Sequence, residues 1–320
     1  MLGVTALLLW LSLRSLNLGE DQNKGQFLWN TWLRSNKTYL FVMALVAMVS
    51  HVIRAERWRM LMVPTGHRVA LSSSFLSVMV GYLINLVIPR GGEFSRCINL
   101  QQLEKTPVEI SFGTVVIERI VDVMCLLILL AIAFIVEWDQ LILFIQSLPW
   151  SSDGEKFPLK FLILGLVGLT LMVGVYFLIR KNERVQKIME GFREGLLSIV
   201  RLEKKGLFIF YSLAIWGLYF WMSYFIVLAF PETSTLGPGA VLVLFAIGAI
   251  AMAVPLPGGA GSYHTLVPLG LVALYRLNQA DAIAFVFVFH AWQTLIFIIG
   301  GIVSLAISYA ILQWRKQNQK

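Results

Sequence analysis

The sequence predicts an all-α polytopic membrane protein with about six spanning helices and two opposed re-entrant helical hairpins in an inverted repeat. Its 320 residues are 58% hydrophobic and only 14% charged, whereas soluble domains carry about 25% charged residues. Apolar runs fill nearly the whole chain, and two of them are broken by proline and glycine, at 89–92 and at 255–259. We therefore expect a single membrane domain over residues 1–320.

The apolar runs set the expected helices. They fall at residues 1–16, 38–53, 72–89, 112–136, 159–179, 207–229, 239–256, 265–275 and 283–312. The first run is short for a span of about 20 residues, so either it thins the bilayer or the chain starts further upstream. Residues 17–37 place Trp29 and Trp32 among polar residues, which favours an interfacial amphipathic helix over a surface loop.

Charge in the connections predicts the orientation. Residues 54–71 carry four arginines against one glutamate, and residues 180–205 carry eight basic against four acidic residues. Cytoplasmic loops are enriched in such basic residues, so both segments and the basic tail are placed inside, and the acidic segment 137–158 outside. We expect both termini in the cytoplasm of a bacterial or archaeal cell, and an amphipathic connector at 180–205.

Parity then requires the two hairpins. Two apolar runs lie between the inside segment 54–71 and the outside segment 137–158, so one must return on the same side. The predicted hairpin is 72–110 within a first repeat 38–136. By the same reasoning, hairpin 239–275 lies within a second repeat 207–312 of opposite orientation, a recurring transporter plan. The alternative makes 72–89 and 239–256 full spans joined to ordinary loops.

The first break carries the leading candidate site. Pro89 is followed within seven residues by Arg90, Gly91, Gly92, Glu93 and Arg96. Backbone N–H groups freed at the two glycines favour an anion site, and arginine binds phosphate with fork geometry. Glu93 could hold Arg90 or Arg96 in place, or take a proton. The alternative is a cluster of loop-end charges that reach toward the membrane surface.

A second charged group lies early in the apolar run 112–136. Glu118 and Asp122 share one helix face, and Arg119 lies between them in the sequence. Three charges in five residues of a membrane helix are expected to face protein or water and to pair. Arg119 could bind a lipid phosphate or pair with Glu93, and the alternative is a structural ion-pair network. The basic segment 54–59 is interpreted as positive-inside anchoring, and the alternative is attraction to anionic lipid headgroups.

The second break supplies further candidates, namely Pro257, Gly258, Gly259, Gly261 and His264. Glycines let the backbone approach a ligand closely. His264 could titrate or donate to an anion, although a lone histidine is more often structural. We expect the two breaks to form two halves of one site.

Motifs for enzyme chemistry are missing from the sequence. It holds no G-x-x-x-x-G-K-[ST] phosphate loop, no H-E-x-x-H zinc helix and no G-x-S-x-G elbow. We therefore predict no catalytic residues, no cofactor and no metal. The net charge of +8 is explained by the cytoplasmic loops, so no nucleic-acid partner is expected.

Three segments carry a family resemblance: 85–96 (NLVIPRGGEFSR), 118–122 (ERIVD) and 257–261 (PGGAG). In this order they resemble the lysylphosphatidylglycerol synthase transmembrane-region family of flippase-like membrane proteins, over about residues 38–310. The resemblance implies a unit that moves lipids between leaflets or supports synthesis of lipid-linked envelope components. The family often has glutamate where this chain has His264. The soluble aminoacyl-transferase domain of bifunctional relatives has no counterpart here, so we expect no lysyltransferase activity.

The leading functional hypothesis is translocation of an anionic phospholipid or a polyprenyl-phosphate-linked lipid across the inner membrane. Arg90, Arg96 and Arg119 would hold the phosphate. The carboxylates of Glu93, Glu118 and Asp122 would organise those arginines or couple protons. The alternatives are a non-transporting lipid-binding module that serves an envelope-lipid enzyme, and a membrane-embedded transferase. The sequence predicts no oligomeric state.

Overall fold

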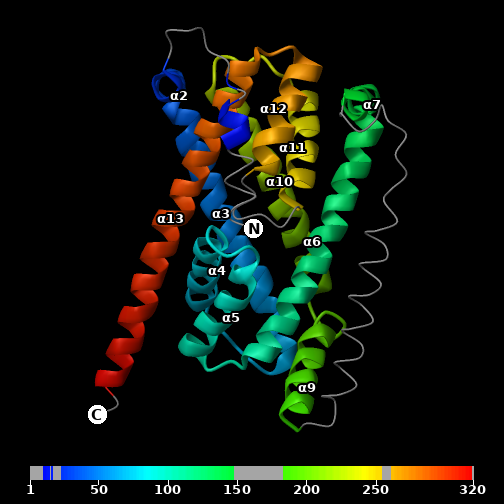
Figure 1. Cartoon of the computed structure of the whole chain (residues 1–320). Coiled ribbons are helices and arrows are strands. Elements are labelled where there is room, and N and C mark those ends of the chain that lie inside the picture. Colours follow the sequence, from blue (N-terminus) through cyan, green and yellow to red (C-terminus); the bar gives the residue numbers. More distant parts are fainter. Residues whose placement is uncertain (1–9, 15, 17–22, 148–182, 254–260, 319–320) are drawn as a thin grey trace.

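The computed structural model describes residues 10–14, 16, 23–147, 183–253 and 261–318. The regular secondary structure assigned to these residues is helical throughout, as the sequence predicts (Figure 1). The elements are α2 (Lys24–Arg34), α3 (Lys37–Met62), the 3-10 helix η1 (Val63–Thr65), α4 (Leu71–Asn85), α5 (Gly91–Glu104), α6 (Val108–Val136), α7 (Trp138–Ser147), α9 (Glu183–Leu197), α10 (Lys205–Ala229), α11 (Pro238–Ala253), α12 (Ser262–Tyr275) and α13 (Gln279–Gln317).

Four helical segments in the described part of the chain are long and apolar enough to cross a membrane. They are Lys37–Thr65, Val108–Val136, Lys205–Ala229 and Gln279–Gln317. These segments coincide with four of the six predicted spans. The predicted run 159–179 lies outside the described residues, and of the run 1–16 only 10–14 and 16 are described. The total of six spans therefore stays a prediction.

Two pairs of shorter helices lie at opposite ends of the bundle. α4 packs beside α5 in the lower half of Figure 1, and α11 packs beside α12 in the upper half. Each pair begins and ends at its own end of the molecule. With 14 to 16 residues, these helices are about 21–24 Å long, shorter than a hydrocarbon core of about 30 Å. Membrane re-entry and an inverted repeat stay predictions.

The chain reverses between α4 and α5 slightly before the predicted break. α4 ends at Asn85 although the apolar run continues to Ile88. Pro89 lacks a backbone donor, and Arg90 adopts the left-handed conformation with φ 60°. The side chain of Asn85 accepts a hydrogen bond of 2.8 Å from the N–H of Gly92. This bond ties the start of α5 to the end of α4.

Three elements outside the candidate spans clarify the predicted connections. α2 forms within the segment 17–37 that was expected to be an interfacial helix. α9 forms within the predicted connector 180–205, and it packs along α6 (Figure 1). Residues 138–147, placed by the sequence in an outside connection, form the helix α7. The predicted positions of these elements relative to a membrane remain predictions.

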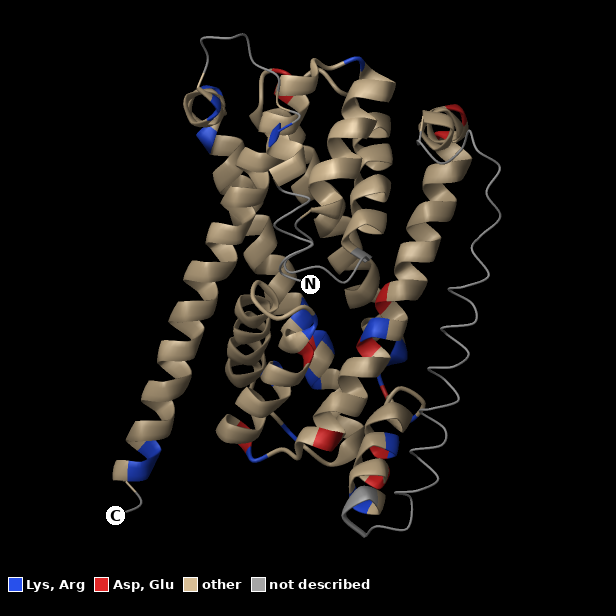
Figure 2. Cartoon of the chain, viewed as in Figure 1, with Lys and Arg blue, Asp and Glu red and all other residues tan. Residues whose placement is uncertain are grey.

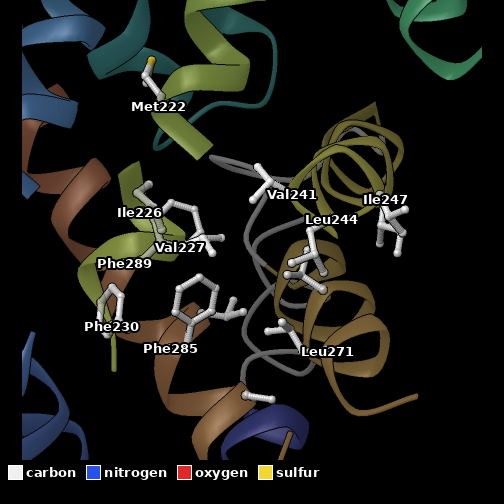
Figure 3. Packing of buried hydrophobic residues seen from close by; sticks show 14 of the residues in the cluster. Met222, Ile226, Val227, Phe230, Val241, Leu244, Ile247, Leu271, Phe285 and Phe289 are labelled. Atoms are coloured by element: carbon white, nitrogen blue, oxygen red, sulfur yellow. The ribbon is translucent and has the colours of Figure 1, made fainter. Parts of the chain in front are cut away.

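The largest apolar core lies in the half of the molecule that holds α11 and α12. Figure 3 shows side chains of α10, α11, α12 and α13 meeting there. The rings of Phe230 and Phe285, for example, have centroids 5.0 Å apart. Charged side chains instead meet inside the lower half, between α3, α5 and α6 (Figure 2). Among the described residues, the buried cluster of charged side chains therefore lies to one side of the apolar core.

Candidate functional site

The charged cluster is centred on Glu118 of α6. Its Oε1 accepts hydrogen bonds from Arg54 Nη1 at 2.9 Å and from Arg57 Nη2 at 3.2 Å. Its Oε2 accepts one from Arg96 Nη2 at 2.9 Å. The side chain of Glu118 is fully buried. Burying an unpaired carboxylate costs much free energy, so these three guanidinium groups are needed to stabilise the ionised form of Glu118.

Asp122 lies one helical turn after Glu118 and shares two of its partners. Its Oδ1 accepts a hydrogen bond of 2.7 Å from Arg57 Nη2. Its Oδ2 lies 3.2 Å from Arg54 Nη2 and 3.4 Å from Arg119 Nη1. The predicted shared face of Glu118 and Asp122 therefore meets arginines from α3.

Arg54 and Arg57 were missed as site residues, and their assignment to positive-inside anchoring is wrong. The structure leaves 4% of Arg54 and none of Arg57 exposed. Arg59, in contrast, is half-exposed and pairs with Glu56 at 2.8 Å, as an anchoring residue would. One signal could have identified them. Arginines three residues apart lie on one helix face, and the carboxylate pair of α6 needs such counter-charges.

The cluster also reaches the second half of the chain through α10. Arg54 Nη2 donates to the hydroxyl of Tyr219 at 2.9 Å, and Arg57 Nη1 donates to Ser212 Oγ at 3.2 Å. The guanidinium of Arg96 lies over the ring of Trp58 at 4.7 Å from its centroid. Helices α3, α5, α6 and α10 are thus joined by polar contacts at one level of the bundle.

The two glycines of the first break have a packing role. The N–H of Gly91 donates to Ile88 O at 2.9 Å, and that of Gly92 donates to Asn85. The expectation that both N–H groups are free to bind an anion is therefore wrong. A Cβ on Gly92 would lie 2.1 Å from the carbonyl oxygen of Gly81. Glycine is required there because the backbones of α4 and α5 nearly touch.

A small pocket opens beside the cluster. It has room for about one water molecule. Its lining residues are Arg54, Val78, Gly81, Tyr82, Asn85, Gly92, Glu93, Arg96 and Arg119. Arg119 Nε lies 3.4 Å from Glu93 Oε1, and 42% of the Arg119 side chain is exposed. The pocket is therefore basic but partly occupied by a carboxylate of the protein itself.

The predicted pairings around the first break are rearranged in the structure. Glu93 pairs with Arg119, one of the two roles expected for that arginine, rather than with Arg96, which pairs with Glu118. Arg90 is exposed in the turn before α5 and does not line the pocket. Arg96 is deeply buried and already paired, so Arg119 is the predicted arginine that both lines the pocket and remains accessible.

The second break is only partly described. Pro257, Gly258 and Gly259 lie outside the described residues. Gly261, with φ 100°, precedes α12, and its N–H donates to Nδ1 of the buried His264 at 3.5 Å. Neither of these two residues lines the pocket. Among the described residues, the structure thus does not join the two breaks into one site.

Within the ranges that the structure describes, no group of three or more His, Cys, Asp or Glu side chains is placed to hold a metal ion. The carboxylates of the cluster face arginines instead. The arrangement is suited to holding an anion next to Arg119.

Comparisons with known proteins give one family and one relative. The model of the family described as "Lysylphosphatidylglycerol synthase TM region" matches residues 1–301. A UPF0104 membrane protein of Methanocaldococcus jannaschii is 31% identical over 93 residues, which is 28% of this chain and 28% of that protein. The alignment thus spans little more than a quarter of the relative's length. No solved structure matches the chain.

Proposed function

This chain belongs to the lysylphosphatidylglycerol synthase TM region family, and from that membership and its charged cluster we propose that it moves an anionic lipid between the leaflets of a membrane. The family match and the four apolar helices make it a multi-pass membrane protein with a lipid-related role. Translocation, rather than a lipid-related role in general, is the proposal. It does not include catalysis.

The observation that carries the proposal is the charge balance around the pocket. Four arginines (Arg54, Arg57, Arg96 and Arg119) meet three carboxylates (Glu93, Glu118 and Asp122), which leaves one positive charge in excess. Ionisable groups within a membrane bundle are costly and mark ligand or ion pathways. An excess of guanidinium charge favours an anion, and phosphate oxygens fit its fork geometry.

The helix pairs support movement rather than binding alone. The pair α4–α5 and the pair α11–α12 lie at opposite ends of the bundle (Figure 1). Opposed broken helices are the plan by which transporters alternate access to a central site. We propose that both pairs enter the membrane as re-entrant hairpins of two inverted repeats. The lipid would be an anionic phospholipid or a polyprenyl-phosphate-linked lipid.

Orientation follows from charge. The basic connections after α3 and around α9 favour the cytoplasmic side, which places the pocket nearer to that side because α4 and α5 start and end there. We propose a location in the cytoplasmic membrane of a bacterium or archaeon, with both termini inside. A lipid headgroup would then enter from the inner leaflet.

The test is transbilayer movement of labelled lipids in liposomes that contain the purified protein. The lipids are phosphatidylglycerol, phosphatidylcholine and a polyprenyl phosphate. We expect flux of an anionic lipid that is lost in Arg119→Gln and retained in Arg201→Gln, a matched change in an exposed connection. Arg90→Ala tests the sequence prediction that the arginine in the turn also holds the phosphate, a role that requires loss of transport in a folded protein.

One outcome would contradict the proposed site, and two would contradict translocation. Equal flux in the wild type and in Arg119→Gln would remove the pocket from the mechanism. Binding of an anionic lipid without flux, with or without an imposed proton gradient, would favour a lipid-presenting module that serves an envelope-lipid enzyme. Turnover of the labelled lipid would indicate a transferase.

A further inference from the structure

Glu93 is held less firmly than the other carboxylates of the cluster. Glu118 and Asp122 each contact three arginines, with donor–acceptor distances as short as 2.7 Å. The side chain of Glu93 forms an ion pair with Arg119 alone among the described residues, at 3.4 Å. Its side chain is also more exposed, at 19% against 0% and 11%. Glu93 is therefore the carboxylate that can leave the cluster by rotating its own side chain.

The contact between Glu93 and Arg119 is also incompletely satisfied. Glu93 Oε2 is buried and accepts no hydrogen bond from the residues that the structure describes. Arg119 Nε likewise makes no hydrogen bond of good geometry there. Buried polar atoms without partners cost free energy. Arg119 is thus poised for an acceptor that satisfies its Nε better than Glu93 does.

The pocket brings this pair together with deeper positive charge. Arg54 and Arg96 line the same pocket, and both are at least nine-tenths buried. The Nε atom of each lacks a hydrogen-bond partner within the described residues. An anion that reached Arg119 would therefore also be attracted by the guanidinium groups of Arg54 and Arg96, which are buried and held in place.

We propose that Glu93 occupies the position of the ligand's anionic group on Arg119, and that it sets the charge of the ligand that can replace it. This inference rests on the proposed function. With Glu93 displaced but still nearby, the cluster has one positive charge in excess, which one negative charge neutralises. A phosphodiester headgroup supplies one such charge. A phosphomonoester carries about 1.5 to 2 negative charges near neutral pH, and Glu93 repels the surplus.

The test measures binding to the purified protein in non-ionic detergent by titration calorimetry. The probes are dihexanoyl phosphatidylglycerol, a phosphodiester, and dihexanoyl phosphatidic acid, a phosphomonoester. Inorganic phosphate distinguishes a lipid headgroup from a free anion. Glu93→Gln removes the charge at nearly constant shape. Glu104→Gln makes the same change on the same helix, outside the pocket lining.

We expect Glu93→Gln to tighten binding of both lipids and to tighten phosphatidic acid more. The change should be roughly two- to fivefold for the phosphodiester, since partly exposed ion pairs contribute little. Glu104→Gln should leave both affinities unchanged. In an Arg119→Gln background, Glu93→Gln should tighten binding less than in the wild type, because Glu93 no longer competes for Arg119 and only its direct repulsion of the ligand is removed.

Three results would overturn the inference. One is an unchanged or weaker affinity in a folded Glu93→Gln protein. A second is an unchanged ratio between the two lipids. The third is measured on the wild-type protein and needs no variant at Glu93. It is equally tight binding of the phosphomonoester and the phosphodiester. If Arg119→Gln weakens binding but Glu93→Gln does nothing, only the role of Glu93 fails. If Arg119→Gln itself has no effect, the proposed site fails.

Discussion

Arg57 of α3 and Glu118 of α6 are both fully buried, and their closest side-chain atoms lie 3.2 Å apart. Neither residue is exposed to solvent or lipid. A buried ion pair contributes little net stability when compared with an apolar pair of the same shape, but breaking one partner is strongly destabilising. The contact therefore fixes the relative position of α3 and α6. This arrangement in turn positions Arg119 and Glu93.

Glu118→Gln should lower the free energy of unfolding by about 3–5 kcal/mol, because it leaves three buried guanidinium groups with one remaining buried carboxylate. The measurement is denaturant titration in mixed micelles. Glu104→Gln is the control, since Glu104 accepts a hydrogen bond from Ala70 N that glutamine can also accept. A Glu118→Gln protein as stable as the control would show that the cluster is not held by this carboxylate.

Gly92→Ala should separate α4 from α5 and cost about 1–3 kcal/mol, the usual effect of overpacking. The added Cβ would lie 2.1 Å from Gly81 O, and backbone cannot rotate away as a side chain can. Gly217→Ala in α10 is the matched control, because nothing lies within 4 Å of its Cβ position. The same titration gives both values. If the two variants are equally stable, the backbones of α4 and α5 do not lie as close together at Gly92 as the structure shows.

Local pattern was sufficient for much of the fold. Pro89 followed by two glycines predicted a break that the structure places between α4 and α5. The spacing of Glu118 and Asp122 predicted a shared charged face, because residues four apart meet on a helix. Both predictions depend on neighbours in the sequence, so composition and periodicity could reach them.

The pairing partners could not be predicted in this way. Arg54 and Arg57 end an apolar run, and anchoring arginines at a membrane surface have the same local pattern. Their burial depends on α3 lying against α6 and α10, which is a long-range packing relationship. The bond from Gly92 to Asn85 similarly depends on the geometry of the turn. The sequence therefore identified side chains of the right chemistry at the break, but some of the partners predicted for them were wrong.

The membrane topology gives a third prediction. Arg68 and Gln102 are exposed near the start of α4 and the end of α5. If these helices form a re-entrant hairpin, cysteines at both positions should react with an impermeant maleimide from the same side of the membrane. That side should be the side of Arg201→Cys and opposite to Asp139→Cys. Labelling of intact cells or oriented vesicles makes the measurement.

The native cysteines must not interfere with that labelling. Cys97 and Cys125 are both free and buried. Alanine replaces both of them in the labelling experiment, so that only the introduced cysteines can react with the maleimide. Opposite sidedness of Arg68→Cys and Gln102→Cys would mean that an odd number of spans lies between them. The first hairpin would then be a full span followed by an ordinary loop.

The contact between α6 and α9 supplies the last prediction. A Cβ on Gly113 would lie 2.4 Å from Phe192 O, and one on Gly195 would lie 2.3 Å from Ile110 O. These contacts involve backbone on both sides, so a methyl group at either glycine must push the helices apart. α9 should then be held less tightly.

Gly195→Ala should therefore speed trypsin cleavage after Lys187, which is exposed on α9, because cleavage requires the helix to open locally and a loosened helix opens more often. Gly113→Ala should act in the same direction from the opposite helix. Gly206→Ala, at a position with nothing within 4 Å, should leave the cleavage rate unchanged. Equal rates in all three variants would show that α9 is not held against α6 by this glycine contact, and the connector would then be free to move independently of the charged cluster.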